Sequence, residues 1–179
     1  MASEPATIFS EHEVHSPYVH VDMSDANCNL LGAQFFQDEA LTLVNQLRAQ
    51  DQVCGGQTML ASKPLTWNAK LQIAAYEHSA QMAATNLVSH VSLDGRRLHD
   101  RVAITGYQHI LLGENIAAGK IDVRTAIQRW FNSPPHCQQM LTSEFTEIAI
   151  ACVAKDNSFY KRYWTMNLGR PLSLPKPIQ

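Results

Sequence analysis

A single acid in the middle of an apolar stretch constrains the fold of this chain more than any other residue. Glu114 lies within the run 110–117, which is otherwise rich in Ile, Leu and Ala and is bounded by glycines, so the run predicts a β-strand. Alternation along a strand places Leu112 and Ile116 on the same face as Glu114. Because burying an unpaired carboxylate costs on the order of several kcal/mol, we expect the fold to supply Glu114 with a partner.

Two histidines are the candidates for that partner. His90 follows a stretch with a helical pattern, and His136 follows Ser133 and two prolines. Serine is favoured as a helix N-cap and proline in the first helical turn, so His136 is predicted to lie where a helix begins. The positive end of the helix dipole disfavours an imidazolium there, and we expect the His136 ring to be neutral. A neutral imidazole can bind a metal or accept a hydrogen bond.

A set of short motifs, in a fixed order, carries a family resemblance. The motifs are Ser89-His90, Asp94-Gly95, Asp100-Arg101, Gly106-Tyr107, Gly113-Glu114-Asn115-Ile116-Ala117, Trp130-Phe131-Asn132-Ser133-Pro134-Pro135-His136 and Tyr163-Trp164-Thr165. With them the chain resembles the bacterial, SCP-like branch of the CAP superfamily, which is named after cysteine-rich secretory proteins, antigen 5 and pathogenesis-related proteins. The resemblance runs from about Phe35 to Leu168, which is most of the chain.

The resemblance implies an α+β fold, a three-layer α-β-α sandwich around a small central antiparallel sheet. It also implies an open cavity, lined by two histidines and two glutamates, that can hold a divalent metal. The histidines correspond to His90 and His136, and the first glutamate corresponds to Glu114. In eukaryotic members the second glutamate stands three positions after a tryptophan, where this chain has Ser133. The resemblance therefore places Ser133 beside the cavity, which lacks the second glutamate. Glu147 is a candidate to supply the missing carboxylate.

Three functions stay open at this stage. The first is a secreted or periplasmic binding protein, because members of the superfamily are associated with binding of lipid or sterol and with host or envelope partners. Its cavity of His90, His136 and Glu114 would supply three ligands to a divalent metal, most plausibly Zn²⁺, and leave a position for water. The second is a metal-dependent hydrolase, with bound water as nucleophile and Glu114 or Glu147 as base. The third is a structural envelope protein, in which these groups need not be accessible.

The cysteines favour an oxidising compartment. Cys28, Cys54, Cys137 and Cys152 form no Cys-x-x-Cys pair, so a structural zinc site or a thioredoxin-like site is poorly supported. Of the three ways to pair them, we predict Cys28–Cys54 and Cys137–Cys152, because each pair brackets one local unit of the chain. Buried free thiols are the alternative.

Composition bounds the partners and the number of domains. The chain has 179 residues, 45% of them hydrophobic, and a formal charge of -2, which suits one globular domain without a polybasic surface for nucleic acid. No run approaches the roughly 18 apolar residues of a membrane span, so we expect no integral membrane protein. The first residues lack the basic and apolar regions of a signal peptide, so either that peptide was removed or none exists.

The pattern along the chain divides it into an N-terminal extension (1–33), a CAP domain (34–170) and a C-terminal tail (171–179). The histidines of the extension, at positions 12, 15 and 20, are either a metal-binding tail or part of a solvated segment.

Asn115 should point away from Glu114 and satisfy nearby backbone groups. His78 lies on an apolar helical stripe, where a packed core histidine is the simpler interpretation than a ligand. Helices are predicted over 35–53, 68–87, 122–131 and 134–141, and strands over 110–117, 147–153 and 160–168.

Overall fold

The computed structural model describes residue 28 and residues 33–172. Most of the predicted extension, including its three histidines, and most of the predicted tail lie outside these residues, so the domain boundaries stay predictions. Within the described part no helix combines the length and the apolar character needed to cross a bilayer. The elements are α1 (Ala33–Arg48), β1 (Gln52–Cys54), β2 (Gln57–Met59), β3 (Thr66–Trp67), α2 (Ala69–Thr85), α3 (Leu98–Ile104), β4 (His109–Ala118), α4 (Val123–Asn132), α5 (Pro134–Leu141), β5 (Glu147–Ala154) and β6 (Arg162–Pro171).

The central sheet has the strand order β3-β5-β6-β4, and a separate small hairpin is formed by β1 and β2. Strand β6 pairs antiparallel with both of its neighbours, and Glu114 on β4 stands opposite Asn167. The short strand β3 runs parallel to β5, with Thr66 opposite Glu147. The sheet is therefore antiparallel except for β3, and β4 forms one of its edges.

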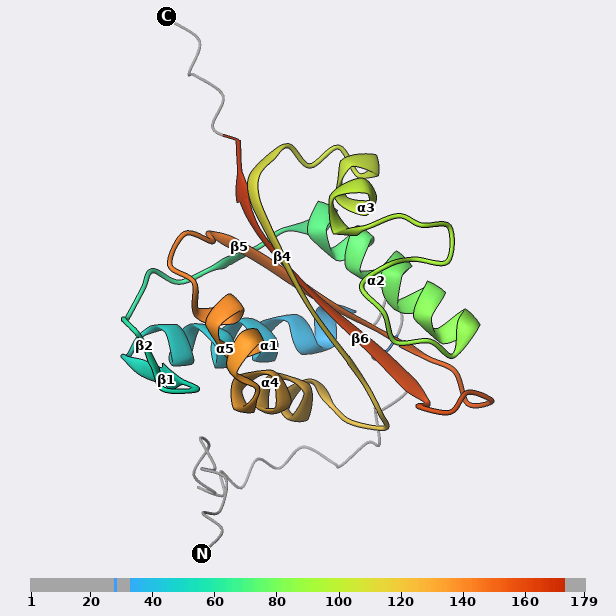
Figure 1. Ribbon diagram of the computed structural model, residues 1–179, viewed down its shortest axis with the longest axis horizontal. Coiled ribbons are helices and arrows are strands. Elements are labelled where there is room, and N and C mark those ends of the chain that lie inside the picture. The colour runs from blue at the N-terminus through green and yellow to red at the C-terminus, as the bar shows by residue number, and fades with distance from the viewer. Residues whose placement is uncertain (1–27, 29–32, 173–179) are drawn as a thin grey trace, which may run out of the picture.

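Helices cover both faces of this sheet, which confirms the predicted three-layer α-β-α sandwich. Figure 1 shows α2 and α3 on one side of the strands and α1, α4 and α5 on the other. Trp164, Met166 and Leu168 on β6 pack into the main core beneath α1, α4 and α5. Tyr163 and Asn167 on the opposite face of β6 are also buried, because β6 is a central strand covered on both sides.

The longer helices confirm the predictions from capping and periodicity. Helix α2 begins after Asn68, whose side-chain oxygen accepts hydrogen bonds from two backbone N–H groups of the first turn. Helix α4 begins after Asp122, which caps it in the same way. Helix α1 ends at Arg48, several residues earlier than predicted, and the hairpin β1–β2 follows it. Helix α3 was not predicted, because seven residues are too few to establish a helical period.

A buried arginine fixes the helix that carries His136. Arg48 is 1% exposed, and its guanidinium donates hydrogen bonds to the carbonyls of Met140 and Thr142 at 3.0 and 2.9 Å and of Phe145 at 3.3 Å. These acceptors lie at and just beyond the C-terminal end of α5, where helix carbonyls lack partners of their own. Burial lowers the pKa of Arg48 to about 10, so the side chain stays charged at neutral pH. Helix α5 is therefore held against α1 at the end opposite His136.

The predicted disulfide pairing is wrong, although all four cysteines are bonded as expected. The bridges join Cys28 to Cys152 and Cys54 to Cys137, with Cα atoms 4.5 and 5.6 Å apart. The backbone at Cys28 lies along β5, where its carbonyl accepts from the N–H of Ala154. The hairpin β1–β2 packs on α5 and brings Cys54 to Cys137. Proximity in the sequence was the basis of the prediction, whereas packing between distant elements sets the pairing.

Candidate functional site

A cavity of about 540 Å³ opens across the edge of β4, between the segment 90–98 and the start of α5. His90, Glu114 and His136 all line it, so the three residues predicted to converge do reach one cavity. The remaining lining residues are Arg97, Leu98, Leu112, Gly113, Pro135 and Gln139. The site is thus assembled from both sides of an edge strand, with α3 on one side and α5 on the other.

Glu114 does have a buried partner, and it is one that the sequence did not reveal. The carboxylate is almost fully buried, and its Oε2 lies 2.5 Å from Nη2 of Arg101, whose side chain is completely buried. Arg101 belongs to α3, the helix that periodicity missed, and Asp100-Arg101 is one of the motifs that carry the resemblance. That motif was the only signal in the sequence, and nothing in it indicated burial.

Arg101 also fixes the loop that carries His90. Its Nη1 donates to the carbonyls of His90 and Arg96, at 3.2 and 3.0 Å, and to the hydroxyl of Ser92 at 3.1 Å. Ser92 is itself buried. One guanidinium therefore joins α3, the loop 90–96 and the edge strand, and it places His90 over Glu114.

The His90 ring is oriented by the same carboxylate. Its Nδ1 lies 2.8 Å from Oε1 of Glu114. Burial acts to raise the pKa of Glu114. The hydrogen bond to His90 and the charges of His78 and Arg101 outweigh this effect, so the pKa of Glu114 lies below its usual value. An ionised carboxylate can only accept, so Nδ1 carries the hydrogen and donates it. The Nε2 atom is left for other partners, and the side chain is 55% exposed.

His136 is oriented in a similar way by a neutral group. Its Nδ1 lies 2.9 Å from Oγ of Ser133, which leaves Nε2 without a partner in the described part of the chain. Ser133 occupies the predicted N-cap position of α5, but its side chain bonds the ring and caps no backbone N–H group. Burial, followed by the nearby His90, lowers the pKa of His136. The ring is therefore neutral at neutral pH, as predicted, with burial as the main cause.

A third histidine lies behind Glu114 in the core. His78 is fully buried, with Nε2 3.8 Å from Oε1 of Glu114 and Nδ1 3.5 Å from the hydroxyl of Ser92. Burial lowers the pKa of His78 to about 4, and the attraction of Glu114 opposes this only in part. His78 is thus a neutral core histidine, in agreement with the simpler interpretation of its stripe, and it does not line the cavity.

The free edge of β4 is covered by a side chain of α5. With its amide oriented so that both polar atoms are satisfied, Gln139 accepts from the N–H of Glu114 at 2.8 Å and donates to the carbonyl of the same residue at 3.2 Å. Asn115 points to the other face, as predicted, and donates to the carbonyl of His136 at 3.1 Å. These bonds satisfy an exposed strand edge and fix α5 to β4 beside the cavity.

Glu147 does not supply the missing carboxylate. Its Oε2 accepts a hydrogen bond of 2.5 Å from the hydroxyl of Tyr107, and it lines a different cavity with Lys70. The start of β5 pairs with β3, and β6 separates it from β4. Because β5 and β4 are not neighbours, a residue at this position cannot reach the site of Glu114.

The donor set fits a metal poorly. Among the described residues there is no group of three or more His, Cys, Asp or Glu side chains placed to hold a metal ion. Both oxygens of Glu114 are engaged, one by Arg101 and one by His90, so the nitrogens Nε2 of His90 and His136 are the donors that remain. A zinc site needs three or four protein ligands. The buried positive charge of Arg101 also opposes a cation at Glu114.

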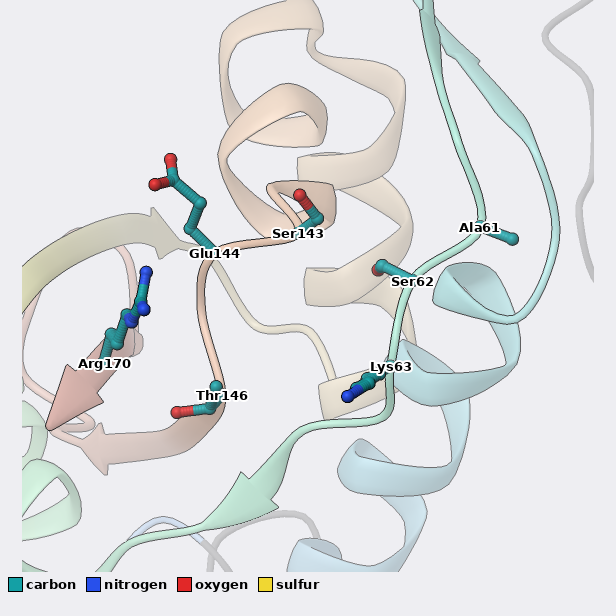
Figure 2. A pocket seen from close by; sticks show the side chains of 7 residues that line it. All are labelled: Ala61, Ser62, Lys63, Ser143, Glu144, Thr146 and Arg170. Carbon is teal, nitrogen blue, oxygen red and sulfur yellow. The ribbon is translucent and has the colours of Figure 1, made fainter. Parts of the chain in front are cut away.

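A larger cavity, of about 770 Å³, lies elsewhere on the molecule. Figure 2 shows Glu144 and Arg170 on one side of it and Ser62 and Lys63 on the other. Its charged side chains are exposed and come from loops and from the end of β6, and no histidine lines it. It lacks the buried supporting network that orients the side chains of the His90–His136 cavity.

A comparison with known families agrees with the arrangement of the elements. The family model described as CAP, cysteine-rich secretory protein family, matches residues 41–168. The chain belongs to this family. The match covers every element from β1 to β5 together with half of α1 and most of β6, and it includes all the residues that line the His90–His136 cavity.

Similar proteins come from several bacteria. Over 101 residues the chain is 32% identical to an uncharacterized membrane protein, YlbC, of Bacillus subtilis strain 168, and the match covers 55% of this chain and 29% of that protein. It is 28% identical to an extracellular protein containing an SCP domain from Bacillus anthracis strain Ames, with a TM-score of 0.62 over 74% of this chain and 39% of that one. The chain thus spans well under two thirds of these two relatives. An outer surface protein of Borrelia burgdorferi shares the fold, with a TM-score of 0.62 at 16% identity over 78% of this chain and 92% of that chain.

Proposed function

We propose that this CAP domain acts outside the cytoplasm as a binding module, and that the cavity of His90 and His136 is its ligand site. Two disulfides support the location, because such bridges persist in oxidising compartments. Similarity to an extracellular protein of Bacillus anthracis and to an outer surface protein of Borrelia burgdorferi supports it as well. The proposed location is therefore either secreted or periplasmic.

The observation that carries the proposal is the orientation of the two rings. Glu114 and Ser133 each engage the Nδ1 atom of one histidine, so both rings are fixed and both Nε2 atoms are left for a ligand. Holding His90 this way requires a buried carboxylate and a buried guanidinium, and each is costly to bury unless it is paired. Packing alone would be served as well by apolar side chains. The accessible ring of His90 disfavours a purely structural envelope role, because that role needs no open polar site.

Hydrolysis is the less supported alternative. A general base must accept a proton near neutral pH, but the pKa of Glu114 is lowered and its oxygens are already bonded to Arg101 and His90. Glu147, the other candidate base, bonds Tyr107 away from the cavity. If a divalent metal such as Zn²⁺ binds, we propose that the Nε2 atoms of the two histidines hold it and that Glu114 only orients His90.

NMR titration of the histidine ring signals tests the proposed site. Compounds that bind the cavity should shift the ring signals of His90 and His136, while the ring signal of buried His78 changes less. The variants His90→Ala and His136→Ala should weaken binding, and His99→Ala, an exposed histidine that does not line the cavity, is the matched control. Ligands that bind this protein with the same affinity in both cavity variants would contradict the proposal.

Lipid or sterol partners, and host or envelope proteins, remain proposals that concern other surfaces of the molecule. Burial of a hydrocarbon chain is favourable by about 25 cal/mol per Å² of apolar surface, and the polar side chains of His90, Arg97, Glu114 and His136 in the lining reduce this gain. The double variant His90→Ala, His136→Ala should therefore keep any binding to lipid vesicles. Loss of vesicle binding in a folded double variant would show that lipid uses the polar cavity after all.

A further inference from the structure

We propose that the ligand group recognised by this cavity is a carboxylate, held by Arg97 together with His90 and His136. The inference rests on the proposed function and adds the chemical class of the ligand. Three features support it: the pairing of the charges at the cavity, the shape of the guanidinium that is left unpaired, and the different lining of the 770 Å³ cavity.

The charges at the cavity leave one positive group without a partner. Glu114 is the single acid in the lining, and buried Arg101 cancels its charge at 2.5 Å. Arg97 also lines the cavity, is exposed, and has no ion pair with any residue in the described part of the chain. The cavity lining therefore has one positive charge in excess, which is the charge of Arg97. A cation entering it would meet Arg97 at the mouth and Arg101 behind Glu114.

The shape of the guanidinium suits a carboxylate. Its planar fork of N–H groups matches the two oxygens of a carboxylate in a bidentate pair. One uncompensated charge also matches a monoanion better than a phosphate dianion. His90 and His136 are in the same lining, where a ring that carries its hydrogen on Nε2 can donate to the anion. For His90, this requires a second proton, because Nδ1 already donates to Glu114.

The cavity in Figure 2 also has one positive charge in excess, but its acid is not paired with a buried cation. It contains Lys63 and Arg170, but the carboxylate of Glu144 stands in the same lining and is not cancelled by a buried cation. An anion there would meet an exposed acid. Arg170 is nevertheless a useful control, because it is an exposed arginine at a cavity of similar kind.

The test is an NMR titration of the whole protein with acetate, and with acetamide as its uncharged analogue, at constant ionic strength. We expect acetate to shift the ring signals of His90 and His136 saturably and acetamide to leave them unchanged. Arg97→Ala should weaken acetate binding about tenfold, equal to about 1.4 kcal/mol, whereas Arg170→Ala should leave it unchanged. Equal weakening in the two variants would show a general charge effect and overturn the inference.

Further comparisons separate this inference from the function on which it rests. If acetamide binds as well as acetate, the cavity is still a ligand site but the carboxylate assignment fails. If Zn²⁺ binds with high affinity through both histidines and acetate does not bind, the assignment also fails. If no compound shifts the two rings, both proposals fail. Where acetate does bind, N-acetyl-dialanine and octanoate distinguish a peptide C-terminus from a fatty acid as the source of the carboxylate.

Discussion

Removing the guanidinium of Arg101 should destabilise this protein more than most substitutions at a single charged residue. In Arg101→Met the side chain keeps a similar length, but the carboxylate of Glu114 stays buried without its 2.5 Å partner. Breaking a buried pair by removing one member costs about 3 to 5 kcal/mol. For a protein of this size each kcal/mol lowers Tm by about 2 to 4 °C, so we expect a fall of roughly 6 to 20 °C.

The pH dependence gives a sharper test than the size of the loss. In the wild type the folded pKa of Glu114 is lowered, so its contribution to stability is present above its usual value of 4.5 and is lost as pH falls through the folded pKa. In Arg101→Met, burial without the guanidinium should raise that pKa above 4.5, and the folded state should then gain stability as the carboxyl takes up a proton. The deficit of the variant, measured by urea denaturation, should shrink between about pH 7 and pH 4.5.

Two controls make the experiment decisive. Replacing both members, in Arg101→Met with Glu114→Gln, should recover most of the loss, because no buried charge is left alone. Arg124→Ala removes the exposed ion pair with Glu39 and should cost at most about 1 kcal/mol. A loss of less than about 1 kcal/mol in Arg101→Met at neutral pH, or a deficit that grows as pH falls, would refute the account of Glu114 given above.

Three further predictions concern the surroundings of the site. Burial lowers the pKa of His78 to about 4, so protonation of this ring favours the unfolded state. Up to about 3 kcal/mol of stability should therefore be lost as the pH falls from 6.5 to 4. In urea denaturation, His78→Leu should reduce this dependence of stability on pH. Gly113→Ala should cost about 1 to 3 kcal/mol in thermal unfolding, because the new Cβ would lie 2.5 Å from the side-chain amide of Gln139 and 2.8 Å from Phe145. Non-reducing peptide mapping should recover the two long-range bridges, and the pairing of neighbours in sequence would contradict the fold.

Local signals in the sequence were enough for most of the elements and for the layer order. Asn68 and Asp122 cap the helices that they were predicted to begin. The short hairpin and helix α3 gave no such signal, because each is too short to show a period. Disulfide pairing was beyond local reasoning, since both bridges join elements that meet only after the sheet and helices have packed.

For the site, the sequence indicated which residues converge but not how they are paired. A carboxylate in an apolar strand implied a partner, and this implication was correct. The identity of the partner depended on α3 folding back over β4, which no local pattern predicts. Glu147 was mistaken for a candidate because its distance from the cavity depends on strand order, and strand order follows from the pairing of the whole sheet.

Ser133 keeps His136 oriented in a cavity that lacks a second glutamate. At the position of that glutamate stands Ser133, and its hydroxyl engages Nδ1 of His136 as Glu114 engages Nδ1 of His90. The serine keeps the orientation of the ring and removes a negative charge, while Arg101 cancels the negative charge that remains. Both features act in the same direction, since each makes the cavity less suited to a cation, as the proposed carboxylate ligand requires. The missing carboxylate and the buried arginine are therefore two parts of one electrostatic arrangement, and Ser133→Glu should partly reverse it by weakening acetate binding.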